Sequence, residues 1–221
     1  MVNNLINHDC DFFVEKAGMQ MLSYHVTPTI ELRAPLPQQD APMLLALLKA
    51  NRDQYQYYLP WVATLQTVDD EQQFLMTAEA QLAQRQALNL VIVVNQQVAG
   101  MIGCDHFEDS DDSANVGYWL GRQFQGQGVM TTAVHGICHL GFDHYHRQRL
   151  RIRAVVDNQA SNAVARRSEF KFLKTEPRGQ HLLDGDHDEN VYELSATMYY
   201  QSLQEKGVTE SGAYHINDEW S

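Results

Sequence analysis

The sequence lacks the long apolar runs and targeting signals of membrane and secreted proteins. Its longest apolar runs, Met43 to Leu48 and Leu90 to Val94, fall far short of the roughly 18 residues that a membrane-spanning helix needs. No lysine or arginine precedes Lys16, and no continuous apolar segment follows it, so the N-terminus has no secretory signal pattern. We therefore expect a cytoplasmic protein without a membrane partner.

Cysteine and basic residues are also scarce. The three cysteines, Cys10, Cys104 and Cys138, are widely spaced and form no CxxC pair, which favours reduced, buried thiols over a disulfide framework. The 16 lysines and arginines against 28 acidic residues give a net charge of −12. Such a charge repels phosphate backbones and anionic membranes and attracts cationic solutes. We therefore expect no nucleic-acid partner and favour a cationic substrate.

What the sequence does have is the composition of one globular domain. Apolar residues make up 44% of its 221 residues, enough for a sizeable core and too many for a disordered chain. At about 150 residues per domain, we expect one domain over 24–202, an N-terminal arm over 1–23 and a polar tail over 203–221. The apolar cluster at 12–14 in the arm makes a homodimer one alternative to a monomer.

The hydrophobic pattern predicts a mixed α/β order, with a mostly antiparallel central sheet flanked by helices. Alternating or continuous apolar runs predict strands, and a 3.6-residue spacing predicts helices. Strands are expected at 24–33, at 88–108 as a hairpin with its turn at 95–97, and at 114–120, 150–156, 170–175 and 190–199. Helices are expected at about 43–48, 69–86, 129–146 and 158–168, the last capped by Asp157 or Asn158.

The most informative stretch is 118–132, YWLGRQFQGQGVMTT, where a predicted strand leads through a glycine-rich turn into a helix. Gly126 and Gly128 let the backbone approach a ligand, and the N–H groups at the start of the helix point at it. This arrangement suits an anion such as a pyrophosphate. The alternative is a strand-to-helix turn that needs glycine for its conformation alone.

Two familiar phosphate loops do not match this stretch. Gly121 and Gly126 have the spacing of the P-loop glycines. Gln127, however, stands where that loop has lysine, and Gly128 stands where it has serine or threonine. The dinucleotide pattern GxGxxG fails because Thr131 takes the place of the third glycine. A different phosphorylated ligand is therefore predicted.

The residues Gln123, Gly126 and Gly128 form a QxxGxG pattern that resembles the acyl-coenzyme A signature of the GNAT superfamily of N-acetyltransferases. Residues 156–170, VDNQASNAVARRSEF, resemble the second coenzyme A segment of that family. The GYWL of 117–120 is typical of the members that acetylate ribosomal-protein N-termini.

The resemblance, which follows residues 24–199 in element order, implies the GNAT fold and acetyl-coenzyme A as co-substrate. It implies that backbone amides over 125–130 hold the pyrophosphate and that the strand at 118–120 pairs with the pantetheine arm. It also places Asn158 and Ser161 beside the thioester. The cofactor-binding residues implied in this way are Trp119, Leu120, Gln123, Gln125, Gly126, Gln127, Gly128, Val129, Met130, Asn158 and Ser161.

Acetyl transfer by direct attack needs an uncharged amine, a polarised thioester carbonyl and a proton for the departing thiolate. Orientation of donor and amine supplies much of the rate, and a backbone N–H near Trp119 or Leu120 can stabilise the developing oxyanion. Ser161 is the candidate acid for the thiolate. The alternative is a serine that only satisfies its own helix backbone.

The catalytic base is not evident from the sequence. Many family members carry a glutamate just before the Gly-Tyr of this strand, whereas Ala114, Asn115 and Val116 hold no carboxylate. Asp105 and His106 are the nearest candidates, against the alternative of a solvent-facing or hydrogen-bonded structural role. A water chain is a further alternative, because an α-amine has a pKa of about 8 against about 10.4 for lysine.

No metal site is predicted. His135 and His139 are spaced to share a helical face, but the HExxH pattern fails because Gly136 replaces the glutamate. The acidic run at 184–188 resembles the start of a calcium loop, yet Glu189 stands where that loop needs glycine.

We therefore predict an N-acetyltransferase whose acceptor is a primary amine, first of all a protein N-terminal α-amine of the ribosomal-protein type. Polyamines and aminoglycosides are alternative acceptors. A coenzyme A-binding module without catalysis is a second alternative, motivated by the missing carboxylate and by Glu169, where the family usually has glycine. The aromatic patch at 55–61 lies where the resemblance places the acceptor-side helices, unless it only covers the core.

Overall fold

The computed structural model describes residues 13–16, 19–105, 107 and 112–207, whose strands form one nine-stranded sheet in the order β1-β2-β3-β4-β5-β6-β7-β9-β8. The strands are β1 (Phe13–Lys16), β2 (Met19–Thr27), β3 (Ile30–Arg33), β4 (Leu88–Val94), β5 (Gln97–Asp105), β6 (Ser113–Leu120), β7 (Arg149–Val155), β8 (Lys171–Leu182) and β9 (Gly185–Ser195). The α-helices are α1 (Pro37–Ala50), α2 (Arg52–Tyr58), α3 (Val68–Ala83), α4 (Val129–His139), α5 (Gln159–Arg167) and α6 (Ala196–Glu205). Shorter turns are the 3₁₀-helices η1 (Pro60–Ala63) and η2 (Arg122–Phe124) and the π-helical turn η3 (Leu140–His144). Within the described ranges, every helix is too short or too polar to span a bilayer.

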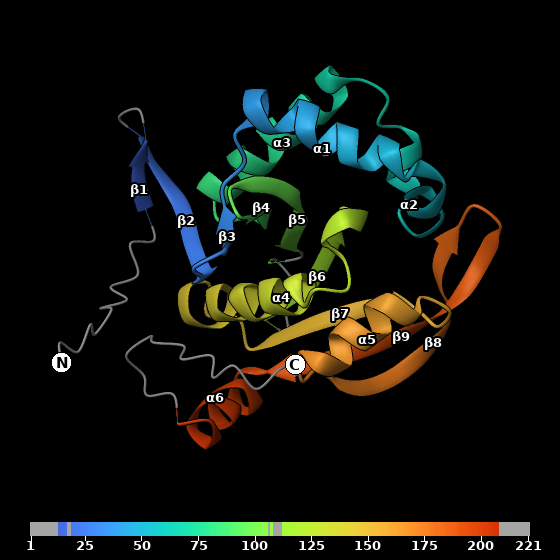
Figure 1. Ribbon diagram of the computed structural model, residues 1–221. Helices are drawn as coiled ribbons and strands as arrows, with labels where there is room; N and C mark the ends of the chain where they lie inside the picture. The colour runs from blue at the N-terminus through green and yellow to red at the C-terminus, as the bar shows by residue number, and fades with distance from the viewer. Residues whose placement is uncertain (1–12, 17–18, 106, 108–111, 208–221) are drawn as a thin grey trace.

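Two hydrophobic cores cover the two faces of the sheet. One face packs against α4, where Val134 and Ile137 of the helix lie in the same buried cluster as Leu150 of β7. The other face packs against α1 and α3, through Leu44 and Leu75. Figure 1 shows the same division, with α1 and α3 on one side of the sheet and α4 and α5 on the other. Successive residues of one strand point to opposite faces, so each central strand contributes to both cores.

Among the described strands, β6 and β7 are the one parallel pair, and they are paired over a short stretch. Residues 113–115 of β6 face 149–151 of β7. β6 stays paired with β5 as far as Leu120, whereas β7 continues along β9 over 149–155. The edge of β6 over 116–120 therefore has no strand partner on the β7 side among the described strands. The Leu120 carbonyl already accepts from Tyr55 and Gln125, and the other backbone groups on this edge can pair with a ligand.

Most elements expected from the pattern are confirmed. The hairpin expected over 88–108 is β4 and β5, which ends at Asp105, and the strand expected at 114–120 is β6. The long helix expected over 129–146 is α4 followed by a π-helical turn that ends at His144. The capping side chain of α5 is that of Asn158, whose Oδ1 accepts the Ser161 N–H at 3.1 Å.

Three expectations need correction. The strand expected over 24–33 is a hairpin of β2 and β3, because the chain turns at Pro28, where the Thr27 hydroxyl accepts the Ile30 N–H. β8 is longer than the expected strand and reaches Leu182. The strand expected over 190–199 ends at Ser195, whose hydroxyl accepts the Met198 N–H at 3.3 Å and caps α6.

Regular structure extends beyond 24–202 at both ends, since β2 begins at Met19 and α6 runs to Glu205. Phe12 of the apolar cluster in the arm, and the tail from 208 onward, lie outside the described residues.

Candidate active site

The turn after β6 has the backbone conformation of an anion-binding loop. Gly126 and Gly128 have φ angles of 73° and 76°, in the left-handed region that favours glycine. Gly128 is the N-cap of α4. A Cβ built on either glycine would meet no atom within 4 Å. The conformation thus requires glycine, and the open space beside it admits a ligand.

The N–H groups of this turn are available for hydrogen bonding. In the described part of the chain, those from Gly126 to Thr131 have no protein acceptor, and the first helical bond of α4 runs from the Thr132 N–H to the Gly128 carbonyl at 3.0 Å. Free N–H groups at a helix N-terminus attract an anion, assisted by the helix dipole. Gln125 differs, because its N–H already donates to the Arg122 carbonyl at 3.2 Å. The loop therefore offers N–H groups from Gly126 onward.

The remaining loop residues predicted to bind the cofactor differ in how their side chains lie. The side chains of Val129 and Met130 are buried in the core, so only their N–H groups face outward. Gln123 is exposed, and its carbonyl accepts the Gln127 side-chain amide at 2.8 Å, which tightens the turn.

Two arginines that our sequence analysis did not single out lie at this loop. Arg122 is exposed on η2, directly before the glycines. Arg167, at the end of α5, donates to the Thr131 hydroxyl at 3.4 Å and so lies at the first turn of α4. Arg122 lies in the stretch 118–132 and Arg167 in the stretch 156–170, which both resemble coenzyme A segments of the family. That position in the sequence could have identified them as candidate site residues. Both add positive charge where a pyrophosphate would bind.

The open edge of β6 has a defined set of donors and acceptors. The Gly121 N–H donates to Ala99 of β5 at 2.7 Å. Backbone groups along an antiparallel strand alternate between its two edges, so the Trp119 N–H faces β5 and the Leu120 N–H faces the open edge. Of the two oxyanion donors expected from the sequence, Leu120 therefore has the suitable orientation. The Trp119 side chain is buried in the core under α1 and α3.

Ser161 and Tyr118 meet across the open edge. The Tyr118 hydroxyl lies 3.0 Å from Ser161 Oγ and 3.3 Å from the Ser161 carbonyl oxygen. Burial raises the pKa of Tyr118 to about 12, so the phenol is protonated at neutral pH. The Ser161 N–H is held by Asn158, whereas the Ser161 hydroxyl bonds to another element rather than to its own helix backbone. Tyr118 was part of the GYWL motif but was not recognised as a site residue.

The N-terminus of α5 is fixed to the sheet by one buried amide. The Asn162 side chain donates to the carbonyls of Val155 and Asn158 at 2.9 and 2.8 Å and accepts from Asn190 and Tyr192 at 2.8 Å each. Every polar atom of this amide is satisfied, so the helix that carries Ser161 has a fixed position relative to β7 and β9.

The sheet face opposite α4 carries the candidate base. Asp105 pairs with Asn115 across β5 and β6, and Asn115 pairs with Arg151 across β6 and β7. Side chains directly opposite each other share a face, with Cβ atoms roughly 5 Å apart. Asp105 is exposed, and its partner Asn115 lies in the stretch 114–116, which has no carboxylate. His106, the other candidate, lies outside the described residues.

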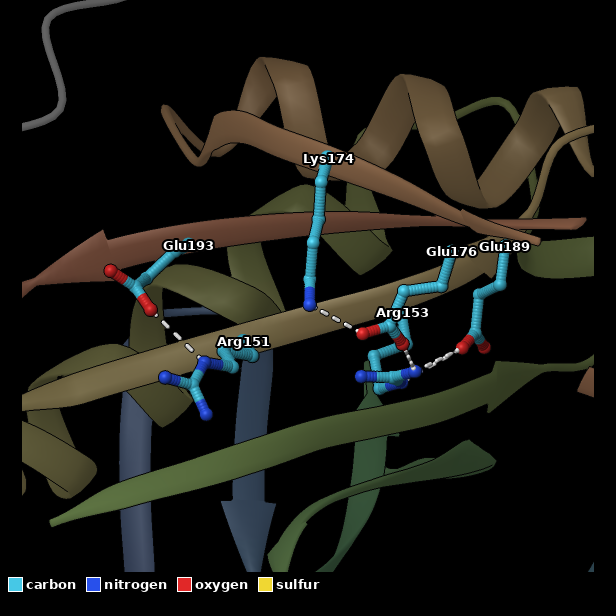
Figure 2. Close-up of polar contacts among 6 residues, drawn as sticks. All are labelled: Arg151, Arg153, Lys174, Glu176, Glu189 and Glu193. Atoms are coloured by element: carbon cyan, nitrogen blue, oxygen red, sulfur yellow. Dashed lines mark hydrogen bonds and ion pairs between the residues drawn. The ribbon is translucent and has the colours of Figure 1, made fainter. Parts of the chain in front are cut away.

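The same face of β7, β8 and β9 is bound together by ion pairs (Figure 2). Arg153 contacts both Glu176 and Glu189, the latter through its Nε at 2.8 Å. Glu189 is 4% exposed, and burial raises its pKa against the effect of the arginine. Lys174 contacts Glu176 at 2.5 Å, and Arg151 contacts Glu193 at 3.0 Å. These pairs fix β7 at the point where β6 leaves it.

Glu169 has a structural function at the position where the family usually has glycine. Its φ is 67°, in the left-handed region. Its carboxylate accepts from the Ser202 hydroxyl at 2.6 Å and from Lys206 at 2.7 Å, and these two contacts lower its pKa against the effect of burial. The strained residue therefore ties the end of α5 to α6.

The aromatic patch at 55–61 does more than cover the core. Tyr55 is buried beside Trp119, with ring centroids 6.0 Å apart. The Tyr57 hydroxyl contacts Asp184 at 3.1 Å and so links α2 to the turn between β8 and β9, which Figure 1 shows reaching toward α2. Trp61 stacks on Phe74 of α3.

Within the described ranges, no group of three or more His, Cys, Asp or Glu residues has the geometry of a metal site. His139 instead contacts Asp143 at 2.7 Å and stacks on Tyr24, and Asp184 contacts His187 at 2.8 Å. Cys104 and Cys138 are free and buried.

Comparison with known proteins agrees with this geometry. A family model described as an acetyltransferase (GNAT) domain matches residues 29–171. A ribosomal-protein-serine acetyltransferase of Escherichia coli is 27% identical over 168 residues, which cover 76% of this chain and 93% of that protein. YdaF of Bacillus subtilis, a putative ribosomal N-acetyltransferase, is 25% identical over 165 residues, which cover 74% of this chain and 88% of that protein.

Solved structures share the fold and hold the coenzyme. The microcin self-immunity acetyltransferase MccE, in complex with acetyl-coenzyme A and AMP, has a TM-score of 0.74 at 27% identity and covers 78% of this chain and 95% of its own. RimL, a ribosomal α-N-protein acetyltransferase in complex with coenzyme A, also has a TM-score of 0.74, at 28% identity, and covers 78% of this chain and 97% of its own.

Proposed function

Since this chain belongs to the GNAT family and is an acetyl-coenzyme A-dependent N-acetyltransferase, we propose that its acceptor is a protein N-terminal α-amine of the ribosomal-protein type. The names of the E. coli and B. subtilis relatives support this acceptor. The net charge of −12 favours a cationic acceptor. An α-amine, with a pKa of about 8, also loses its proton more readily than a lysine side chain.

The donor side of the proposed reaction is supported by the juxtaposition of an open N–H loop with an open strand edge. The N–H groups from Gly126 to Met130 would hold the pyrophosphate, with Arg122 and Arg167 beside them. The edge of β6 over 116–120 would pair with the amides of the pantetheine arm, as an added strand does. When bound, the co-substrate supplies an acetyl group on a thioester that an amine can attack directly.

The chain itself would orient the reactants and stabilise charge. The Leu120 N–H is our candidate donor to the thioester oxygen, and the Ser161 hydroxyl is our candidate proton donor to the sulfur. Asp105 is our candidate acceptor for the proton of the amine, directly or through water. That proton then passes to solvent, and solvent reprotonates Ser161.

The test is acetyl transfer from acetyl-coenzyme A to a panel of amines. Release of the coenzyme A thiol measures the rate, and mass spectrometry identifies the acetylated product. We expect turnover of peptides with a free N-terminus, and none of the same peptides with a blocked N-terminus. Spermidine and an aminoglycoside represent the alternative acceptors. Turnover of a small amine without turnover of any peptide would contradict the proposed acceptor.

The alternative left open by the sequence, a coenzyme A-binding module without catalysis, does not agree with the family model or with relatives that are named as acetyltransferases. It was motivated by the lack of a carboxylate at 114–116 and by Glu169, which takes a left-handed conformation. This alternative predicts that coenzyme A raises the melting temperature while no amine of the panel is acetylated. Activity toward any amine, reduced in Ser161→Ala, would exclude it.

A further inference from the structure

We propose that Tyr118 is a positioning residue for Ser161: its phenol donates to the Ser161 hydroxyl and leaves the proton of the serine to point at the sulfur of the co-substrate. The inference deepens the proposed function, because it rests on Ser161 as the group that faces the sulfur. Tyr118 acts through the serine and need not touch the co-substrate itself.

The geometry supports a directed hydrogen bond. The Tyr118 phenol has one proton and two acceptors within reach, Ser161 Oγ at 3.0 Å and the Ser161 carbonyl oxygen at 3.3 Å. The hydroxyl oxygen is the nearer of the two, and a carbonyl in the first turn of a helix already accepts the N–H four residues further on. When the phenol donates to the hydroxyl, the serine proton is left for a third atom. Among the described contacts, the Ser161 hydroxyl bonds to Tyr118, and the Asn158 cap is bonded by the Ser161 backbone N–H instead.

The protonation state of Tyr118 supports the same direction. Burial raises its pKa to about 12, so the phenol remains a neutral donor throughout the pH range in which a thiol titrates. Negative charge on the sulfur favours the arrangement in which each hydroxyl donates toward it, first Tyr118 to Ser161 and then Ser161 to sulfur.

A second tyrosine, Tyr192 of β9, provides a matched control because it contacts the same helix, α5. The Tyr192 hydroxyl donates to Asn162 of α5 at 2.8 Å and contacts Arg166 at 3.2 Å, and neither partner faces the sulfur in the proposed site. Tyr192→Phe therefore removes a hydroxyl contact of α5 without removing the contact to Ser161. If general loosening of α5 were the cause of an effect, both Tyr→Phe variants would show it.

The test measures the thiol of bound coenzyme A by its thiolate absorbance between about pH 6 and 10, which needs no turnover. Burial raises the pKa of the Cys104 and Cys138 thiols, and subtracting coenzyme-free protein removes any remaining background. The proteins compared are wild type, Tyr118→Phe, Ser161→Ala, the double variant and Tyr192→Phe. Thermal unfolding of each variant identifies any that fails to fold.

We expect a hydrogen bond from Ser161 to lower the pKa of the bound thiol. Tyr118→Phe should raise that pKa by about half a unit to one unit, which is about a 3- to 10-fold loss of thiolate at a given pH. Ser161→Ala should raise it further, and the double variant should match Ser161→Ala, because Tyr118 acts only through the serine. Tyr192→Phe should leave it unchanged. Single-turnover rates with any accepted amine should follow the same non-additive pattern.

Each contrary result is informative. An unchanged thiol pKa in Tyr118→Phe, or an effect that adds to that of Ser161→Ala, would overturn the positioning role. An equal shift in Tyr192→Phe would assign the effect to loosening of α5. If the thiol titrations behave as expected but no peptide is acetylated, the proposed acceptor fails while the role of Tyr118 stands. If wild type binds no coenzyme A, both proposals fail.

Discussion

The Tyr55 hydroxyl donates to the carbonyl of Leu120 at 2.8 Å and so joins α2 to the last residue of β6 across 65 positions of sequence. The same carbonyl accepts the side-chain amide of Gln125 at 2.8 Å. Burial raises the pKa of Tyr55, which keeps the phenol a donor. A residue of α2 thus helps to position the strand end from which the glycine turn begins.

Removal of this hydroxyl should weaken coenzyme binding. In Tyr55→Phe the Leu120 carbonyl keeps one of its two donors, and we expect a loss of about 1 kcal/mol in the free energy of unfolding. Freedom at the end of β6 should also weaken acetyl-coenzyme A binding by a few-fold, on the order of 1 kcal/mol. Urea unfolding and calorimetric titration measure the two effects. Tyr58→Phe, on the same helix, is the control and should change neither.

The two glycines of the turn give a second prediction. Gly126→Ala and Gly128→Ala place a side chain at positive φ and should each cost on the order of 1 kcal/mol of stability. They should also abolish the rise in melting temperature with acetyl-coenzyme A, because the Cβ enters the space beside the open N–H groups. Gly207, with a φ of 72° beyond α6, is the matched control. Gly207→Ala should lose a similar amount of stability but keep the rise in melting temperature with acetyl-coenzyme A. If Gly207→Ala also lost that rise, the losses in Gly126→Ala and Gly128→Ala would not show that the glycine turn binds the coenzyme.

Sequence patterns predicted the parts of the fold that depend on neighbouring residues. The strand, glycine turn and helix over 118–132 follow from local alternation, glycine content and helical spacing. The pattern also narrowed the cap of α5 to Asp157 or Asn158, and the structure shows Asn158. The end of β9 at Ser195 was missed because an apolar pattern continues into α6, where a serine cap decides the boundary.

The contacts that complete the site are non-local and were not predictable in this way. Tyr118 meets Ser161 across 43 positions, and Asp105 faces Asn115 only because of the β5 and β6 register. Such pairs depend on strand order and on where β6 leaves β7, and neither can be derived from local spacing. The family resemblance identified Ser161 but said nothing about its partner.

Glu71 predicts an unusual pH dependence of stability. It is 1% exposed in α3, its Oε2 has no hydrogen-bond partner in the described residues, and burial raises its pKa to about 7. Below about pH 4.5 this carboxyl is protonated in both the folded and the unfolded state, and its ionisation does not change the free energy of unfolding. As the pH rises from there to about 7, the unfolded state loses the proton more readily, and the folded state becomes progressively less stable.

Glu71→Gln removes the ionisation and keeps the shape of the side chain. Relative to wild type, we expect its free energy of unfolding to rise by about 1–3 kcal/mol between pH 4.5 and pH 8. Denaturant unfolding at several pH values measures the change. Glu79→Gln, an exposed carboxylate on the same helix, should show no such trend. A flat difference for Glu71→Gln would mean that the carboxyl is solvated or paired in solution.

The ion pairs of Figure 2 predict unequal costs for two cations. Arg153→Met leaves the buried carboxylate of Glu189 without its partner, and we expect a loss of about 2–3 kcal/mol, moderated because the arginine is one-third exposed. Lys174 is 55% exposed, and within the described residues its one ion pair is with Glu176, so Lys174→Met should cost less than about 1 kcal/mol. Urea unfolding at neutral pH compares them. Equal losses would show that the burial of Glu189 does not decide the energetics of this cluster.

The pairing of Asp105 with Asn115 allows an experiment in which the candidate base is transferred from one position to the other. If Asp105 accepts the proton of the amine, Asp105→Asn should slow acetyl transfer by about 10²-fold without changing coenzyme binding. Asn115 lies directly opposite on the same face, so Asn115→Glu in the Asp105→Asn background should recover part of the lost rate. The control is Asn115→Gln in that background, which has nearly the same shape and no proton acceptor. If Asn115→Glu and Asn115→Gln both restored the rate, the effect would be one of packing. If Asp105→Asn were slow and neither substitution restored the rate, a carboxylate would be required at position 105 itself. An undiminished rate in Asp105→Asn would remove this residue from the mechanism and leave a water chain as the route for the proton.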